Sequence, residues 1–230
     1  MKKIFILIVS GLLCASMSGE TLIVDMNPKP PSSATKAAHK DVIASLPFED
    51  TEDFRLAQKG LLAKPDVLRV QDKNGRVVWD MTGLDYLDGD RPETVNPSLW
   101  RQAQLNAIHG LFEVTEGIYQ VRGYDLANVT FIRGDTGWIV VDPLTATETM
   151  DAAMELINSH FGKLPVKAIL ATHSHADHFG GIRALADEDD LNSGRIRFIA
   201  PENFVREVTS ENVIAGNAMT RRAGFMFGSF

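Results

Sequence analysis

The chain contains a dense cluster of side chains that are typical metal ligands: His173, His175, Asp177 and His178. Three of the six histidines in the sequence fall within residues 173–178, which is far denser than chance spacing would give. Neutral imidazoles together with a carboxylate form a donor set that suits zinc. The segment therefore predicts a zinc site.

The spacing within this cluster predicts two neighbouring ions. His173 and His175 are two residues apart in an expected loop and can both turn toward one ion. Asp177 and His178 are adjacent, at the start of an expected helix, and can reach a second ion. Two ions about 3.5–4 Å apart can clamp both the attacking and the leaving oxygen of a hydrolytic reaction. The predicted cofactor is two zinc ions.

The element that must position the cluster is a short, continuously apolar strand over residues 166–170, because α/β sheets place their sites in loops at strand ends. Before it, residues 145–148 read as a capping box for a helix that ends at Gly162. The elements expected after the histidines are a helix, a strand and a second helix, over residues 179–185, 196–199 and 201–208.

The upstream half of the chain reads as strand pairs. Hairpins are expected over residues 67–79, 111–122 and 129–141. Between the first two, Asn96-Pro97 predicts a helix with Asn96 as its cap, stopped by Gly110. Hairpins followed by alternating helix and strand predict an α/β fold with a mixed sheet and helices on its outer face.

Composition narrows the class of protein. Hydrophobic residues make up 44% and charged residues 23%, as in ordinary globular domains. The net charge of −7 argues against a nucleic acid or an anionic membrane as partner, because both require a basic surface.

The first residues read as a targeting segment. Lys2 and Lys3 precede an apolar run of about ten residues, which is too short to span a bilayer, and small residues follow it. We expect residues 1–18 to be a cleaved signal peptide and the protein to be periplasmic or secreted, with a buried N-terminal strand as the alternative. Lipid attachment through Cys14 is disfavoured because the large Leu13 precedes it. Residues 19–46 read as a flexible linker.

The motif His-x-His-x-Asp-His after a strand resembles the signature of the metallo-β-lactamase superfamily. Further segments resemble its secreted alkylsulfatase branch, whose members cleave linear alkyl sulfates such as dodecyl sulfate. These segments are residues 96–101, 123–128, 140–144, 172–181 and 211–219. The resemblance implies an αββα sandwich. It also implies zinc-dependent hydrolysis of a small amphiphilic sulfate ester to an alcohol and sulfate.

Members of this branch are far longer and carry further metal ligands downstream of the first motif. The resemblance therefore implies that this chain is an N-terminal fragment, with only the first half of the sandwich. Residues 47–110 would form an extension of the catalytic domain and residues 111–230 its N-terminal half. The fragment alone is expected to be inactive, and the full-length form to be a homodimer.

The resemblance also assigns the zinc ligands. It implies that His173 and His175 bind one zinc ion, and that Asp177 and His178 bind the other. Asp177 would be the ligand nearest to the zinc-activated water and would orient it or take its proton.

Four further residues receive supporting roles. Asp142, matching the first motif of the superfamily, and Thr172 are expected to support the metal loop without ligating metal. Taken alone, Asp142 fits a turn at a strand end equally well. Arg221 and Arg222 have guanidinium groups suited to a sulfate, with a solvated surface pair as the favoured alternative.

Two other functions stay open. The chain can be a truncated, non-catalytic metal-binding protein, or another metallo-β-lactamase-fold hydrolase that acts on a thioester or a β-lactam. The segments outside the metal motif argue against the second alternative, because those relatives lack them.

Overall fold

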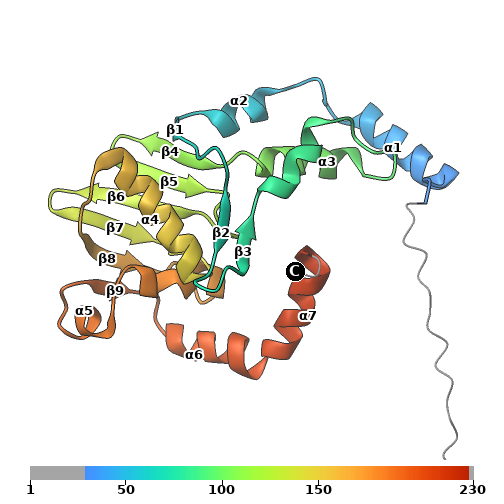
Figure 1. Cartoon of the computed structure of the whole chain (residues 1–230). Coiled ribbons are helices and arrows are strands. Elements are labelled where there is room, and N and C mark those ends of the chain that lie inside the picture. The colour runs from blue at the N-terminus through green and yellow to red at the C-terminus, as the bar shows by residue number, and fades with distance from the viewer. Residues whose placement is uncertain (1–28, 228–230) are drawn as a thin grey trace, which may run out of the picture.

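The structure, a computed structural model, describes residues 29–227 and contains a mixed sheet with helices packed against it (Figure 1). The seven strands of this sheet follow the order β1-β4-β5-β6-β7-β8-β9. Their bounds are Leu61–Ala63 (β1), Gly110–Thr115 (β4), Ile118–Arg122 (β5), Val129–Gly134 (β6), Gly137–Val141 (β7), Val166–Leu170 (β8) and Arg197–Ile199 (β9). Neighbouring strands from β1 to β7 are antiparallel, whereas β7, β8 and β9 are parallel. The predicted α/β class and mixed sheet are confirmed.

The remaining elements are a two-stranded ribbon and the helices. The ribbon pairs β2 (Arg69–Gln71) with β3 (Val77–Asp80). The α-helices are α1 (Ser33–Ser45), α2 (Glu52–Gln58), α3 (Pro97–Asn106), α4 (Thr147–Phe161), α5 (Glu188–Asn192), α6 (Phe204–Thr209) and α7 (Gly216–Phe227). The short turns are η1 (Thr82–Asp88), η2 (Ala176–His178), η3 (Gly180–Ala184) and the π-helical η4 (Ser210–Ile214). Within residues 29–227, no helix has the length and apolarity of a membrane span.

Most elements lie where the local patterns predict them. The predicted hairpins are the pairs β2–β3, β4–β5 and β6–β7. The α3 helix begins as predicted, because the Asn96 side chain accepts a hydrogen bond from the Ser98 backbone N–H at 2.9 Å. Its predicted end is wrong, since the helix ends at Asn106 and Gly110 opens β4. Gly110 has a φ of 138°, and a Cβ there would lie 2.5 Å from the Ala63 carbonyl oxygen. The glycine therefore allows the backbones of β1 and β4 to lie close together.

The expected linker over residues 19–46 is corrected in its second part. Residues 33–45 form α1, which begins where the Ser32 hydroxyl accepts a hydrogen bond from the Thr35 backbone N–H at 3.1 Å. The N-cap serine and the alanines in this segment explain the helix. Residues 1–28, with the expected signal peptide 1–18 and Cys14, lie outside the described residues.

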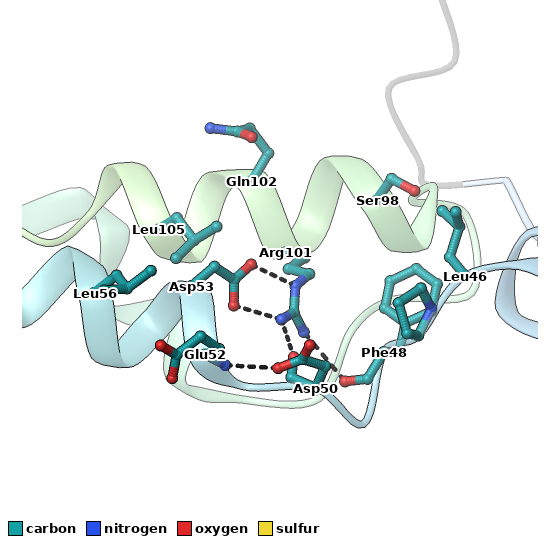
Figure 2. Close-up of a pocket in the computed structure, with 11 residues that line it drawn as sticks. Leu46, Phe48, Asp50, Glu52, Asp53, Leu56, Ser98, Arg101, Gln102 and Leu105 are labelled. Carbon is teal, nitrogen blue, oxygen red and sulfur yellow. Dashed lines mark hydrogen bonds and ion pairs between the residues drawn. The ribbon is translucent and has the colours of Figure 1, made fainter.

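Residues 47–110, expected to be an extension, join the sheet through one strand and are held together by an arginine. Strand β1 pairs with β4, so the extension adds an edge strand to the main sheet. Arg101 on α3 joins the α2 region by donating to the Asp53 carboxylate, at 2.9 Å from Nε, and to the Phe48 carbonyl at 3.1 Å. It also donates to the Asp50 carbonyl, in a hollow of about 530 Å³ between α2 and α3 (Figure 2). The Arg101 guanidinium lowers the pKa of Asp53, and its hydrogen bonds join α3 to the α2 region.

The core lies between one face of the sheet and α4, which crosses that face in Figure 1. Cross-strand neighbours on this face are buried: Tyr119, Phe131, Val140 and Ile169. They pack in one cluster with the fully buried Met150, Ala153 and Ile157 of α4. Alternate residues of the same strands point to the opposite face, where five apolar side chains are half-buried: Ile118, Ile132, Ile139, Val141 and Leu170.

Candidate metal centre

The histidine loop begins where β8 ends, beside the end of β7. The two strands are parallel, so their carboxyl ends meet at the same edge of the sheet. A backbone hydrogen bond of 2.8 Å from Asp142 N–H to the carbonyl of Leu170, the last residue of β8, extends the pairing one residue past β7. This register places Asp142 next to Thr172 and the histidines that follow.

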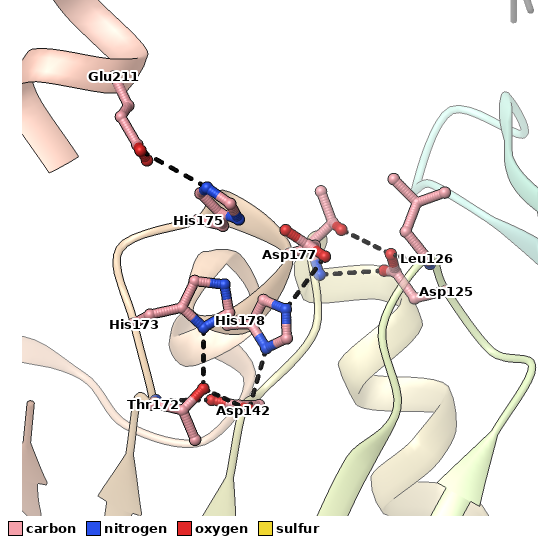
Figure 3. A network of polar contacts seen from close by, with 10 residues as sticks. Asp125, Leu126, Asp142, Thr172, His173, His175, Asp177, His178 and Glu211 are labelled. Carbon is pink, nitrogen blue, oxygen red and sulfur yellow. Dashed lines mark hydrogen bonds and ion pairs between the residues drawn. The ribbon is translucent and has the colours of Figure 1, made fainter. Parts of the chain in front are cut away.

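The Asp142 carboxylate contacts the loop at several points (Figure 3). It accepts hydrogen bonds from the backbone N–H and from the hydroxyl of Thr172, each at 2.8 Å. Its Oδ2 also lies 3.0 Å from Nδ1 of His178. That ring nitrogen is buried, and the contact lacks the alignment of a hydrogen bond. The Thr172 hydroxyl in turn lies 3.0 Å from Nδ1 of His173.

The four predicted ligands lie together in this loop. The ring centroids of His173 and His175 are 4.6 Å apart, and those of His173 and His178 are 4.1 Å apart. Asp177 Oδ2 lies 3.2 Å from Nε2 of His178. Two ligands of a tetrahedral zinc ion, each bonded at 2.0–2.2 Å, are separated by about 3.3 Å, so this pair fits one ion.

The donor chemistry therefore fits zinc, but the donors are gathered as pairs. Among residues 29–227, no group of three His, Cys, Asp or Glu side chains is arranged to hold a single ion. A catalytic zinc ion normally takes three protein ligands and a water molecule.

The turn that carries Asp142 has an unusual backbone. Asp142 and Leu144 have φ angles of 57° and 55°, in the left-handed region that costs a non-glycine residue about 1–3 kcal/mol. Burial of the Leu144 side chain and two hydrogen bonds hold the turn. Gly181 N–H donates to the carbonyls of Pro143 and Leu144 at 3.0 and 3.1 Å. A Cβ on Gly181 would lie 2.3 Å from the Pro143 oxygen, so the turn and the segment after the histidines fit closely.

A buried carboxylate, Asp125, secures the other end of this turn. It accepts hydrogen bonds from the Thr145 backbone N–H at 3.1 Å, the Thr145 hydroxyl at 2.6 Å and the Thr149 hydroxyl. The predicted capping box at residues 145–148 is therefore wrong. The cap of α4 is Ala146, which makes no side-chain cap bond, because Thr145 donates to Asp125 instead. No local spacing marks Asp125 in the sequence.

A second residue that sequence reasoning misses is Glu211 in η4. Its Oε1 lies 3.5 Å from Nε2 of His175, and its Oε2 accepts a hydrogen bond from the Ser174 hydroxyl at 3.3 Å. The segment 211–219 enters the sequence-level resemblance, but nothing in its spacing links this carboxylate to the histidine loop.

Arg221 and Arg222 lie on α7 with exposed side chains. Within the part of the chain that the structure describes, neither guanidinium bonds to the histidine loop. The structure thus brings the four predicted ligands together with Asp142 and Thr172, while their metal ligation and the suggested sulfate contact of the arginines stay predictions.

Comparison with known proteins gives related sequences and a related structure. Residues 122–216 match the family described as the metallo-beta-lactamase superfamily. A linear primary-alkylsulfatase of Pseudomonas sp. is 45% identical over 224 residues, which are 96% of this chain and 33% of the relative. An (R)-specific secondary-alkylsulfatase of Pseudomonas sp. is 44% identical over 223 residues, with 96% and 34% covered.

The similarity extends to three dimensions. The solved structure of the stereoselective inverting sec-alkylsulfatase Pisa1 from Pseudomonas sp. superposes with a TM-score of 0.81 at 48% identity. The superposition covers 86% of this chain and 31% of that one. The chain thus spans about one third of the length of the curated relatives that it matches.

Proposed function

We propose that this chain, which belongs to the metallo-β-lactamase superfamily, is part of a zinc-dependent hydrolase of linear alkyl sulfate esters. The observation that carries the proposal is the gathering of four zinc-type ligands at the joined ends of β7 and β8. The identity to alkylsulfatases over nearly the whole chain supports sulfate esters as the substrate class.

The proposed reaction consumes one water and yields an alcohol and sulfate. His173 and His175 would hold one zinc ion, and Asp177 and His178 the other. When bound, the ions supply a water whose pKa is lowered toward about 7. The Asp177 carboxylate orients that water or accepts its proton. Asp142 lies beside Nδ1 of His178, and the Thr172 hydroxyl lies beside Nδ1 of His173. With these neighbours in place, the two rings need little rearrangement to bind a metal ion.

The proposal also includes the location of the enzyme, its oligomeric state and its contact with the sulfate group. The positive start and short apolar run of residues 1–18 support a cleaved signal peptide and a periplasmic or secreted enzyme. The complete protein is proposed to be a homodimer, and Arg221 and Arg222 to face the sulfate of the substrate.

The test is sulfate release from dodecyl sulfate by the protein expressed from the complete reading frame, with and without a metal chelator. We expect chelation to abolish turnover, and His175→Ala to reduce it by more than about 100-fold. His160→Ala, an exposed histidine on α4, is the matched control and should keep full activity. Sulfate release that survives chelation, or hydrolysis of a β-lactam or thioester in its place, would contradict the proposal.

A further inference from the structure

Glu211 reaches the histidine loop from a separate arm of the molecule, formed by α6, η4 and α7 (Figures 1 and 3). The arm touches the sheet region through Phe204, whose ring lies 5.3 Å from that of Phe179 and 5.7 Å from that of Phe198. Phe179 directly follows the last histidine of the motif. The arm is therefore anchored beside the candidate metal centre.

The backbone around Glu211 forms a widened helical turn. The Ala215 N–H donates to the Ser210 carbonyl at 2.9 Å, which is the i to i+5 bond of a π-helix. Such turns are rare and are found frequently at functional sites, because they change the direction of the side chains that they carry. Here the Glu211 side chain is directed at Ser174 and His175.

The Glu211 carboxylate lies at ion-pair distance, 3.5 Å, from Nε2 of His175 and so favours one of the two ring tautomers. A carboxylate beside Nε2 favours a proton on that nitrogen, which leaves the lone pair of Nδ1 for a metal ion. The other two rings differ from His175. The Thr172 hydroxyl lies beside Nδ1 of His173, whereas His178 has Asp142 at 3.0 Å from Nδ1 and the predicted ligand Asp177 at 3.2 Å from Nε2. Only His175 has a carboxylate partner from the distant α6–η4 segment.

We propose that Glu211 is a positioning residue of the metal centre. Its carboxylate holds the Nε2–H of His175 outward and presents Nδ1 to the zinc ion shared with His173. Ser174 holds the other carboxylate oxygen, so one loop and one arm constrain the same side chain. The inference rests on the proposed zinc-dependent function, and it makes the docking of the α6–η4 arm a condition for tight zinc binding.

The experiment measures zinc affinity by chelator competition, without substrate, in the protein from the complete reading frame. Glu211→Ala should weaken binding of one of the two zinc ions by about 10–100-fold. Glu211→Gln should weaken it less, because its amide oxygen still accepts a hydrogen bond from Nε2–H. The matched control is Glu207→Gln on the same arm, which should leave zinc affinity unchanged. Within residues 29–227 the Glu207 carboxylate pairs only with its neighbour Arg206, at 3.0 Å.

Thermal unfolding of the metal-free variants separates positioning from a structural role. We expect all of them to unfold at the wild-type temperature. The proposal would be overturned if Glu211→Ala bound zinc with wild-type affinity. It would also be overturned if the metal-free variants lost thermal stability in the same order in which they lose zinc affinity. A wild-type protein that binds two zinc ions but releases no sulfate would refute the sulfatase function alone. A wild-type protein that binds no zinc would refute both proposals.

Discussion

Among single residues, Asp142 connects the end of β7 with the histidine loop. Its two carboxylate oxygens contact the Thr172 backbone, the Thr172 hydroxyl and the His178 ring. A carboxylate beside a ligand histidine helps to fix the orientation of the ring. We therefore expect Asp142 to have a large effect on zinc binding, although it is not one of the predicted ligands.

We predict that Asp142→Ala in the intact protein weakens zinc affinity by about 10–100-fold. The reason is that the Thr172 backbone and hydroxyl lose the carboxylate that accepts their hydrogen bonds, and the His178 ring loses its neighbour at Nδ1. Chelator competition measures the affinity, and Asp135→Ala, in the exposed turn between β6 and β7, is the control. Unchanged zinc content and activity in Asp142→Ala would refute the assigned role.

At the scale of elements, the metal loop depends on the fit between two turns. The strained turn after β7 carries Asp142, and η3 after the histidines presses against it through Gly180 and Gly181. Asp125 closes the arrangement by binding Thr145 at the start of α4. A small increase in side-chain volume at this contact must move one of the turns.

We predict that Gly181→Ala lowers the free energy of unfolding by about 1–3 kcal/mol, as expected for overpacking. The added Cβ would lie 2.3 Å from the Pro143 oxygen and 2.7 Å from the Met150 Cβ. Urea unfolding measures the loss. Gly83→Ala in η1 is the control, because a Cβ there has no neighbour within 4 Å. Equal stability of the two variants would show that the turns are not closely fitted.

At the scale of the whole molecule, the two faces of the sheet differ in how far their side chains are buried. The α4 face is fully buried, whereas Ile118, Ile132 and Ile139 on the other face are only half-buried. The histidine loop similarly offers pairs of donors rather than sets of three within residues 29–227. Both features bear on how the 230-residue chain behaves by itself.

We predict that residues 19–230, purified and supplied with zinc, release no sulfate from dodecyl sulfate and aggregate through the apolar face. Each ion would find only two ligands, below the three of a catalytic zinc site. Bound metal and released sulfate are measured on the same sample, with light scattering for aggregation. Stoichiometric binding of two zinc ions with turnover would prove that the site is complete in this chain.

The local pattern of the sequence determined the hairpins, β8, the start of α3 and the cluster of zinc-type side chains. These features depend on residues a few positions apart, whose alternation, turn chemistry and capping are readable from the chain. The resemblance added Asp142 as a candidate, and the parallel register of β7 and β8 then placed it beside Thr172.

Only the tertiary structure decided the contacts between segments far apart in sequence. Asp125 takes the hydroxyl of Thr145 away from the expected capping box, and Gly110 serves the approach of β1 instead of ending a helix. Glu211 meets His175 because a π-helical turn and the packing of Phe204 bring its arm to the loop. Such contacts follow from how elements pack, and packing leaves no periodic signal in the sequence around any one of these residues.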